Sequence, residues 1–210
     1  ISTIDQAIEI DEKRADLHLL KAKAMLLLDR PQAARACLQH ALVLSPEAPE
    51  TIVSGIEILQ QIGEYASALE LAEKYLLLNP HDLGAHYKVA DLARSLLQFD
   101  YAYRVLREGW PLPETGGAQA DTVNRPAITL EDAFSYYCLY GEISLEKDDE
   151  LAAAEGLTQA MRINENHPRI LALQARLEAR TGDLPEGVTT FETLLTQYND
   201  AEANPAPLAG

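Results

Sequence analysis

Residues of the types that carry out chemistry are thinly scattered along this chain of 210 residues. Of its five histidines, His18 and His40 could meet within one helical hairpin, but no carboxylate or cysteine at ligand spacing completes a metal set with them. The two cysteines, Cys37 and Cys138, lie far apart in sequence, so neither a zinc site nor a disulfide framework is indicated. Both fall in apolar runs, where a cysteine usually behaves as a small buried hydrophobe.

Two further stretches resemble ligand loops only superficially. Gly116-Gly117 lacks the flanking strand, the lysine and the spacing of a phosphate loop. The acidic run from Glu146 to Glu150 lacks the alternating acids and the glycine of a calcium loop. It is predicted to form a turn and the start of a helix, where acids favour the helix dipole. The sequence suggests no Ser-His-Asp or Cys-His set, so it predicts no enzymatic activity, no metal and no cofactor.

The composition excludes several classes of partner. The formal net charge is −16, from 33 acidic and 17 basic residues, which argues against general binding to nucleic acid or to an anionic membrane surface. No apolar run approaches the ~20 residues of a membrane span. The first residues lack the basic start and apolar stretch of a signal peptide, so a cytoplasmic location is expected. Because the chain starts in mid-pattern, we interpret it as a piece of a longer protein.

The elements that would position any site are pairs of amphipathic helices. Residues 15–48 predict two helices joined by a tight turn, with an apolar stripe that includes Leu17, Leu20 and Leu27 in the first. Pro31 lies where the second helix should begin, and Ser45-Pro46 should end it. The same pattern returns from starts at Ala15, Pro49, Leu83, Phe134 and Pro168, at spacings of 34, 34, 51 and 34 residues.

Small and apolar residues recur in phase within these units. They are, unit by unit, Lys21-Ala22, Ala34, Ala41 and Pro46; Gly55-Ile56, Ala68 and Pro80; Val89-Ala90 and Ala102; Tyr140-Gly141, Ala153 and Ala160; and Gln174-Ala175 and Gly187. The pattern resembles the tetratricopeptide repeat (TPR), with W-x2-L-G-x2-Y, then A-x3-F, then P over about 34 residues. The chain departs from it in the fourth slot, where His18 and His86 replace tryptophan.

This resemblance implies an all-α fold, a right-handed α-solenoid (superhelix) of antiparallel helix pairs. Small residues in the eighth and twentieth slots are expected to let the paired helices approach closely. The predicted organisation is a remnant of a preceding repeat (1–14), three repeats (15–114), an inserted loop (115–133), two further repeats (134–200) and a loose tail (201–210). Thr129 and Asp132 resemble a capping box, so a helix is expected to begin near Leu130.

The resemblance also implies a binding face. TPR arrays generally bind partners on a concave face lined by the second, fifth, ninth and twelfth slots of each first helix. Carried over slot by slot, the predicted partner-binding residues are Leu19, Lys23, Leu26, Val53, Glu57, Tyr87, Asp91, Arg94, Cys138 and Glu142. The lysine and asparagine clamp of chaperone-binding members is absent, because Leu19 and Lys23 occupy those slots in the first unit. The expected partner is a helix or extended peptide carrying apolar and basic residues.

An aromatic cluster follows the insertion. Tyr137 and Tyr140 occupy packing slots and are predicted to lie in the core. Phe134 and Tyr136 are expected at the start of a helix, covered by the inserted loop or, alternatively, exposed as an anchor for a peptide.

Three functions remain open from the sequence. The first is a protein-interaction scaffold that binds a partner segment in the groove. The second is a substrate-recruiting or accessory repeat domain of a larger enzyme, for example a transferase. The third is self-association, giving a homo-oligomer through stacking of terminal repeats.

Overall fold

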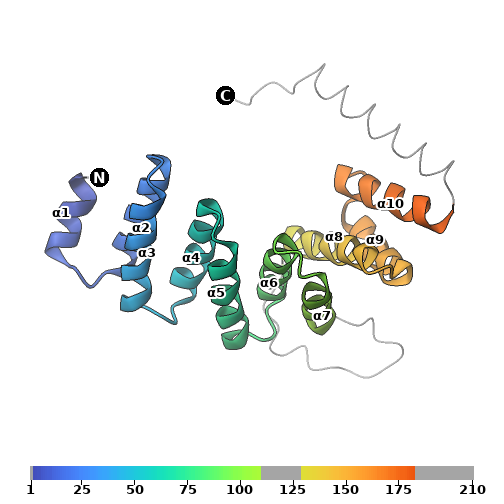
Figure 1. Cartoon of the computed structure of the whole chain (residues 1–210), viewed down its shortest axis with the longest axis horizontal. Helices are drawn as coiled ribbons and strands as arrows, with labels where there is room; N and C mark the ends of the chain where they lie inside the picture. Colours follow the sequence, from blue (N-terminus) through green and yellow to red (C-terminus); the bar gives the residue numbers. More distant parts are fainter. Residues whose placement is uncertain (1, 110–128, 183–210) are drawn as a thin grey trace, which may run out of the picture. The chain divides into compact units, whose positions relative to one another are not determined.

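A computed structural model describes residues 2–109 and 129–182, which fall into two compact units, residues 2–98 and the described residues from 99 to 182. All regular structure in the described ranges is α-helical, so the predicted all-α class is confirmed (Figure 1). None of the helices in these ranges combines the length and apolarity needed to cross a bilayer. Most of the predicted inserted loop, the second helix of the fifth repeat and the predicted tail lie outside the described residues.

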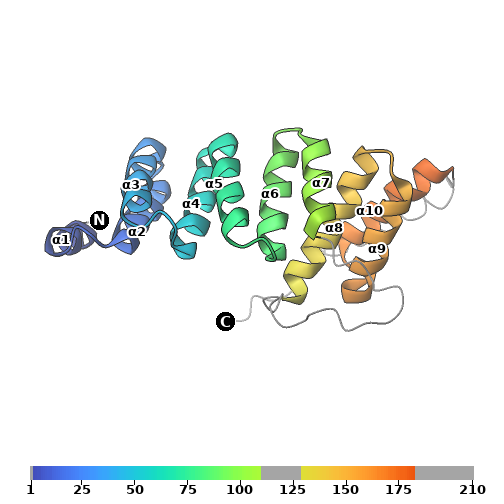
Figure 2. The ribbon, with the colours of Figure 1, turned by 90° about the horizontal axis from the view of Figure 1, so that it is seen from below.

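The first unit is a succession of stacked helices. They are α1 (Ser2–Ile10), α2 (Ala15–Leu27), α3 (Pro31–Leu44), α4 (Pro49–Ile62), α5 (Tyr65–Leu78) and α6 (Leu83–Ser95). Helices α2 and α3 form one antiparallel pair, and α4 and α5 form the next (Figure 2). Helix α4 packs against both α2 and α3, α6 packs against α5, and α1 packs against α2. Each helix pair therefore buries its apolar face against its neighbour, as in an α-solenoid.

The second unit is built around one long helix. It contains α7 (Phe99–Gly109), α8 (Leu130–Glu146), α9 (Glu150–Asn164) and α10 (Pro168–Thr181). Helix α8 contacts all three of the others, and α10 also packs against α9. The buried residues of one core cluster are Phe134, Cys138, Leu145, Ala153, Leu157, Ala160, Ile170 and Leu173.

Local sequence signals set the helix starts. Helices α4 and α10 begin at Pro49 and Pro168, where the missing N–H costs nothing because it would be unpaired in the first turn. Helix α8 begins at Leu130, as the capping box predicted, and the backbone N–H of Asp132 donates to the Thr129 hydroxyl at 3.0 Å. This start lies four residues before Phe134, the position expected from the repeat spacing.

The turn that follows the first helix of each repeat has one conformation. A residue in the left-handed region occupies the same place each time: Asp29 (φ 55°), Gly63 (87°), Leu97 (60°), Asp148 (56°) and Gly182 (92°). Their spacings are 34, 34, 51 and 34 residues, the same as those of the repeat starts. Two of the five are glycines, which adopt positive φ at no steric cost, whereas the other three bear a strain of about 1–2 kcal/mol each.

The paired helices meet at small residues. Where both helices of a pair lie in one unit, the alanines of the twentieth slot, Ala34, Ala68 and Ala153, have no exposed surface. Between α8 and α9 the approach is closer still, because a β-carbon on Gly156 would lie 2.9 Å from the backbone nitrogen of Gly141 and 2.9 Å from the carbonyl oxygen of Tyr137. The expectation that small residues permit this approach is confirmed.

The close approach at Gly156 can be tested with alanine. Gly156→Ala should lower the free energy of unfolding by about 1–3 kcal/mol, measured by urea denaturation, because the new methyl group would force two backbones apart. Gly55→Ala is the matched control, since its β-carbon would meet only side-chain ends, Leu71 Cδ2 at 2.8 Å and Leu38 Cδ1 at 3.1 Å. Those ends can rotate away, so Gly55→Ala should cost less. Equal losses in the two variants would contradict the backbone contact.

Candidate functional site

The most suggestive surface feature of the first unit is a hollow between α2 and α4, the first helices of two successive repeats. Its volume is about 310 Å³, and its lining residues are Lys23, Leu26, Leu27, Glu57, Ile58 and Gln61. Three of these, Lys23, Leu26 and Glu57, are predicted partner-binding residues, and the structure brings them together. The side chain of Leu27 is 89% exposed at the end of α2, so an apolar surface is open to solvent here.

A loose ion pair links the two helices beside this hollow. The ammonium of Lys23 lies 3.6 Å from Glu57 Oε2, and both side chains are about half exposed. A pair of this kind contributes about 0–1 kcal/mol, because solvent screens it and two long side chains lose freedom. Other charged groups can therefore compete for either partner.

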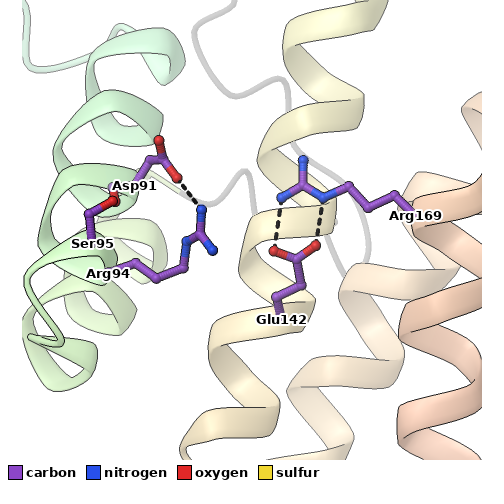
Figure 3. A network of polar contacts seen from close by, with 5 residues as sticks. All are labelled: Asp91, Arg94, Ser95, Glu142 and Arg169. Carbon is purple, nitrogen blue, oxygen red and sulfur yellow. Dashed lines mark hydrogen bonds and ion pairs between the residues drawn. The ribbon is translucent and has the colours of Figure 1, made fainter. Parts of the chain in front are cut away.

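The remaining predicted residues of the first unit are less open. Leu19 is buried beneath the surface of α2, and Val53 and Tyr87 are half-buried on α4 and α6. On α6, Arg94 donates to Asp91 at 2.6 Å, one turn along the same helix (Figure 3). The acid predicted for this part of the groove is thus already paired.

In the second unit, arginines of α10 pair with acids of α8 and of the turn after it. Arg169 donates to both carboxylate oxygens of Glu142, at 2.5 and 2.9 Å (Figure 3). Arg176 donates to Glu146 at 2.6 Å, and Arg180 pairs with Asp148. The Glu142 carboxylate is only 19% exposed, so this bidentate pair is the most enclosed of the three. Glu142, a predicted partner-binding residue, is held inside the unit.

Cys138 lies in the core of the second unit. Its side chain has no exposed surface, and burial is the main cause that raises the pKa of its thiol to about 11. The thiol is therefore protonated at neutral pH and does not reach an open surface. The sequence correctly indicated a buried cysteine, but the same residue cannot also line a groove.

The histidines of the fourth slot have structural roles. The His18 ring stacks on His40 with ring centroids 5.7 Å apart. Its Nε2 lies 3.2 Å from the carbonyl oxygen of Glu12, and His86 Nε2 lies 3.0 Å from that of Pro80. Because a carbonyl only accepts, Nε2 must donate in both contacts.

The second repeat satisfies the equivalent carbonyl differently. Its fourth slot holds Ile52, which has no donor, and Lys74 Nζ instead donates to the carbonyl of Pro46 at 2.7 Å. The carbonyls of residues 12, 46 and 80 are 34 residues apart, and each receives a side-chain donor. These hydrogen bonds stabilise the turns between repeats.

The aromatic residues after the insertion are not exposed anchors. Tyr136 is buried, and its hydroxyl donates to the carbonyl of Leu106 in α7. Phe134 is buried with its ring edge-to-face with His167, at 4.7 Å between centroids. The alternative of a peptide anchor was wrong because both residues pack inward, Tyr136 against α7 and Phe134 within the core cluster beside His167.

The acidic run is a turn and a helix cap. The Asp149 carboxylate accepts from the Tyr103 hydroxyl at 2.6 Å and from the backbone N–H of Ala152 at 3.0 Å. These hydrogen bonds lower the pKa of Asp149. The pKa of Tyr103 is raised, mainly by burial of its hydroxyl and next by its hydrogen bond to Asp149. Within the described ranges, no three His, Cys, Asp or Glu side chains are grouped so that they could hold a metal ion.

Sequence reasoning missed part of the surface. Leu27, Ile58 and Gln61 lie outside the slots carried over from the repeat family, although Leu27 and Gln61 directly follow twelfth-slot residues. It also missed a second hollow of about 300 Å³ between α3 and α5. The lining residues of this second hollow are Arg35, Leu38, Gln39, Leu42, Leu59, Glu64, Ser67, Glu70, Leu71 and Lys74. No pattern in the sequence marks it, because it depends on how two second helices pack.

Comparison with known proteins identifies the fold. MamA from Desulfovibrio magneticus RS-1 superposes with a TM-score of 0.68 at 16% identity, over 89% of this chain and 96% of that one. PilF of Pseudomonas aeruginosa gives 0.63 at 19% identity, over 89% and 77% of the two chains. YrrB, a TPR protein with an unusual peptide-binding site, gives 0.60 at 14% identity, over 92% and 91%.

The chain has the fold of a tetratricopeptide repeat array. No protein-family model matches its sequence, and no curated protein does. The TPR fold is therefore shown by the helix pairs and by these structures. In the sequence, the resemblance to TPR proteins is limited to single positions of each repeat, and the fourth slots depart from the family pattern.

The difference between enclosed and open ion pairs gives a prediction. A double-mutant cycle with Glu142→Gln and Arg169→Gln should show a coupling energy of about 1–2 kcal/mol in the free energy of unfolding, because the pair is bidentate and mostly enclosed. The matched cycle with Lys23→Gln and Glu57→Gln should give at most about 0.5 kcal/mol. Urea denaturation measures both, and an equal coupling in the two cycles would contradict this ranking.

Proposed function

We propose that this chain is a protein-interaction scaffold that holds a segment of a partner protein on the helix-A face, which we define as the surface formed by α2 and α4. The main support is the hollow of about 310 Å³ lined by Lys23, Leu26 and Glu57, three residues predicted to bind a partner. It lies at the low end of ligand-pocket volumes, which suits one inserted side chain.

The lining of the hollow favours an apolar insertion. Leu26 and Leu27 supply aliphatic surface above the buried side chain of Ile58, and Leu27 is almost entirely exposed in the free chain. Covering one such side chain contributes about 1.5–3 kcal/mol, before the costs of association. A large aliphatic or aromatic residue of the partner would therefore anchor the segment.

The ion pairs of the groove acids favour one place for a basic residue of the partner. Of the three predicted groove acids of the ninth slot, Asp91 and Glu142 are held by arginines at 2.6 and 2.5 Å. Among the residues that the structure describes, Lys23 at 3.6 Å is the one basic partner of Glu57, so a lysine or arginine of the partner protein can replace Lys23 there at little cost. We infer a partner segment with one large apolar residue and a basic residue beside it.

Selection from a random peptide library tests this function. Peptides enriched on the wild-type chain should carry a large apolar residue next to a basic one, and Leu27→Ser with Glu57→Lys should weaken their binding at least about tenfold in fluorescence anisotropy. Leu151→Ser is the matched control, because Leu151 is 82% exposed on α9 and lies in the other unit. Failure to enrich any peptide, or equal binding to all variants, would refute the proposal.

A further inference from the structure

A second surface of the first unit carries apolar side chains that its own packing leaves partly or largely exposed. Val43 and Leu44 end α3, and Leu77 and Leu78 end α5; these four residues are called the apolar edge below. Val43 and Leu77 are 80% and 82% exposed. Each pair lies 34 residues from the other, and Ile10 at the end of α1, also exposed, has the register of Leu44. Single exposed hydrophobes are ordinary, but several gathered at one edge mark a candidate interaction surface.

The ends of α3 and α5 lie at the same edge of the unit. Lys74, one turn before Leu78, donates from Nζ to the carbonyl of Pro46 at 2.7 Å, and Pro46 lies two residues after the end of α3. This contact spans 28 residues of sequence and brings the last turns of the two helices together. The apolar edge is therefore distinct from the helix-A face, because it lies on the second helix of each pair.

The helix ends at this edge carry uncompensated negative charge. None of α1, α3 and α5 has a basic residue in its last turn, although a helix C-terminus has a partial charge of about −0.5 that a cation would stabilise. Lys74, one turn before the end of α5, is already bound to a turn carbonyl.

Carboxylates in and beside the following turns add to this charge. Glu9, Glu12, Glu47 and Glu50 are exposed, and none of them makes an ion pair within the described residues. Lys13 is the nearby basic side chain that can offset these carboxylates, because the guanidinium of the neighbouring Arg14 is already paired with Asp16 at 2.5 Å.

We propose that the apolar edge docks a cationic amphipathic segment of a partner protein. Its apolar side chains cover Val43, Leu44, Leu77 and Leu78, and its lysines or arginines face the neighbouring carboxylates and helix C-termini. Lys74 at the carbonyl of Pro46 already makes one contact of this kind within the chain. The same charges oppose two other occupants, a second copy of this chain with its net charge of −16 and an anionic membrane.

A designed peptide serves as the probe. An amphipathic helix of ~18 residues made of leucine and lysine, about 27 Å long, should bind the chain at physiological salt in fluorescence anisotropy, whereas the same design with glutamate for lysine should not. Val43→Ser with Leu77→Ser should weaken binding at least about tenfold. Glu47→Gln with Glu50→Gln should weaken it less and reduce its salt dependence.

Matched controls separate this edge from general attraction to an acidic protein and from the helix-A face. Leu130→Ser with Leu151→Ser removes two similarly exposed leucines elsewhere and should leave binding unchanged. To separate the helix-A face, the titration is repeated in a chain that already carries Leu27→Ser with Glu57→Lys, where Val43→Ser with Leu77→Ser should still weaken the remaining binding at least about tenfold. Circular dichroism confirms that each variant is folded. Equal loss in the Leu130/Leu151 pair, or no loss in the Val43/Leu77 pair, would overturn the proposal. So would a concentration-dependent dimer, or binding to phosphatidylglycerol vesicles, that the Val43/Leu77 pair abolishes.

Discussion

The close approach of paired helices at buried small side chains is the constraint on which the rest of this structure depends. Alanines with no exposed surface recur at the twentieth slot, and at Gly156 not even a methyl group fits between α8 and α9. A larger side chain there would hold the helix axes apart and change how each pair meets the next. The left-handed residue in the turn after the first helix of each repeat serves the same close packing. It reverses the direction of the chain within a few residues, so that the second helix of a pair can pack directly against the first.

Close packing then decides which surface charges meet. Because α10 packs against α8, two nitrogens of the Arg169 guanidinium donate to the two carboxylate oxygens of Glu142. Once α4 lies against α2, Lys23 comes only to 3.6 Å from Glu57. A similar acid at the same repeat position is thus fixed in one unit and available in the other. Under the proposed function, this contrast, rather than the overall acidity of the chain, is what selects Glu57 as the place for a partner's basic residue.

The sequence predicts the architecture well because the architecture is set by local rules repeated in phase. Pro49 and Pro168 begin helices, Thr129 caps α8, and the buried alanines follow the repeat spacing. Gly63 and Gly182 mark left-handed turns, but Asp29, Leu97 and Asp148 adopt the same conformation without any such signal, under the demand of the packed helices.

The details of the surface were less predictable. Phe134 and Tyr136 are buried by packing against His167 and against α7, which the repeat pattern does not specify. Ion pairs such as Arg169 with Glu142 join residues 27 apart and depend on side-chain reach across two helices. The part played by Leu27 and Ile58 in the hollow depends likewise on how α2 and α4 cross, which slot-by-slot comparison with a repeat family does not specify.

The central claim is that the hollow between α2 and α4 receives an apolar side chain of a partner. Methyl NMR spectra of the chain, recorded during titration with a library-selected peptide, test it most directly. The account predicts that the methyl signals of Leu26, Leu27 and Ile58 shift together and saturate with the bound fraction, while those of Leu151 on α9 stay in place. Saturating shifts confined to methyl groups elsewhere, with Leu27 and Ile58 unchanged, would contradict it.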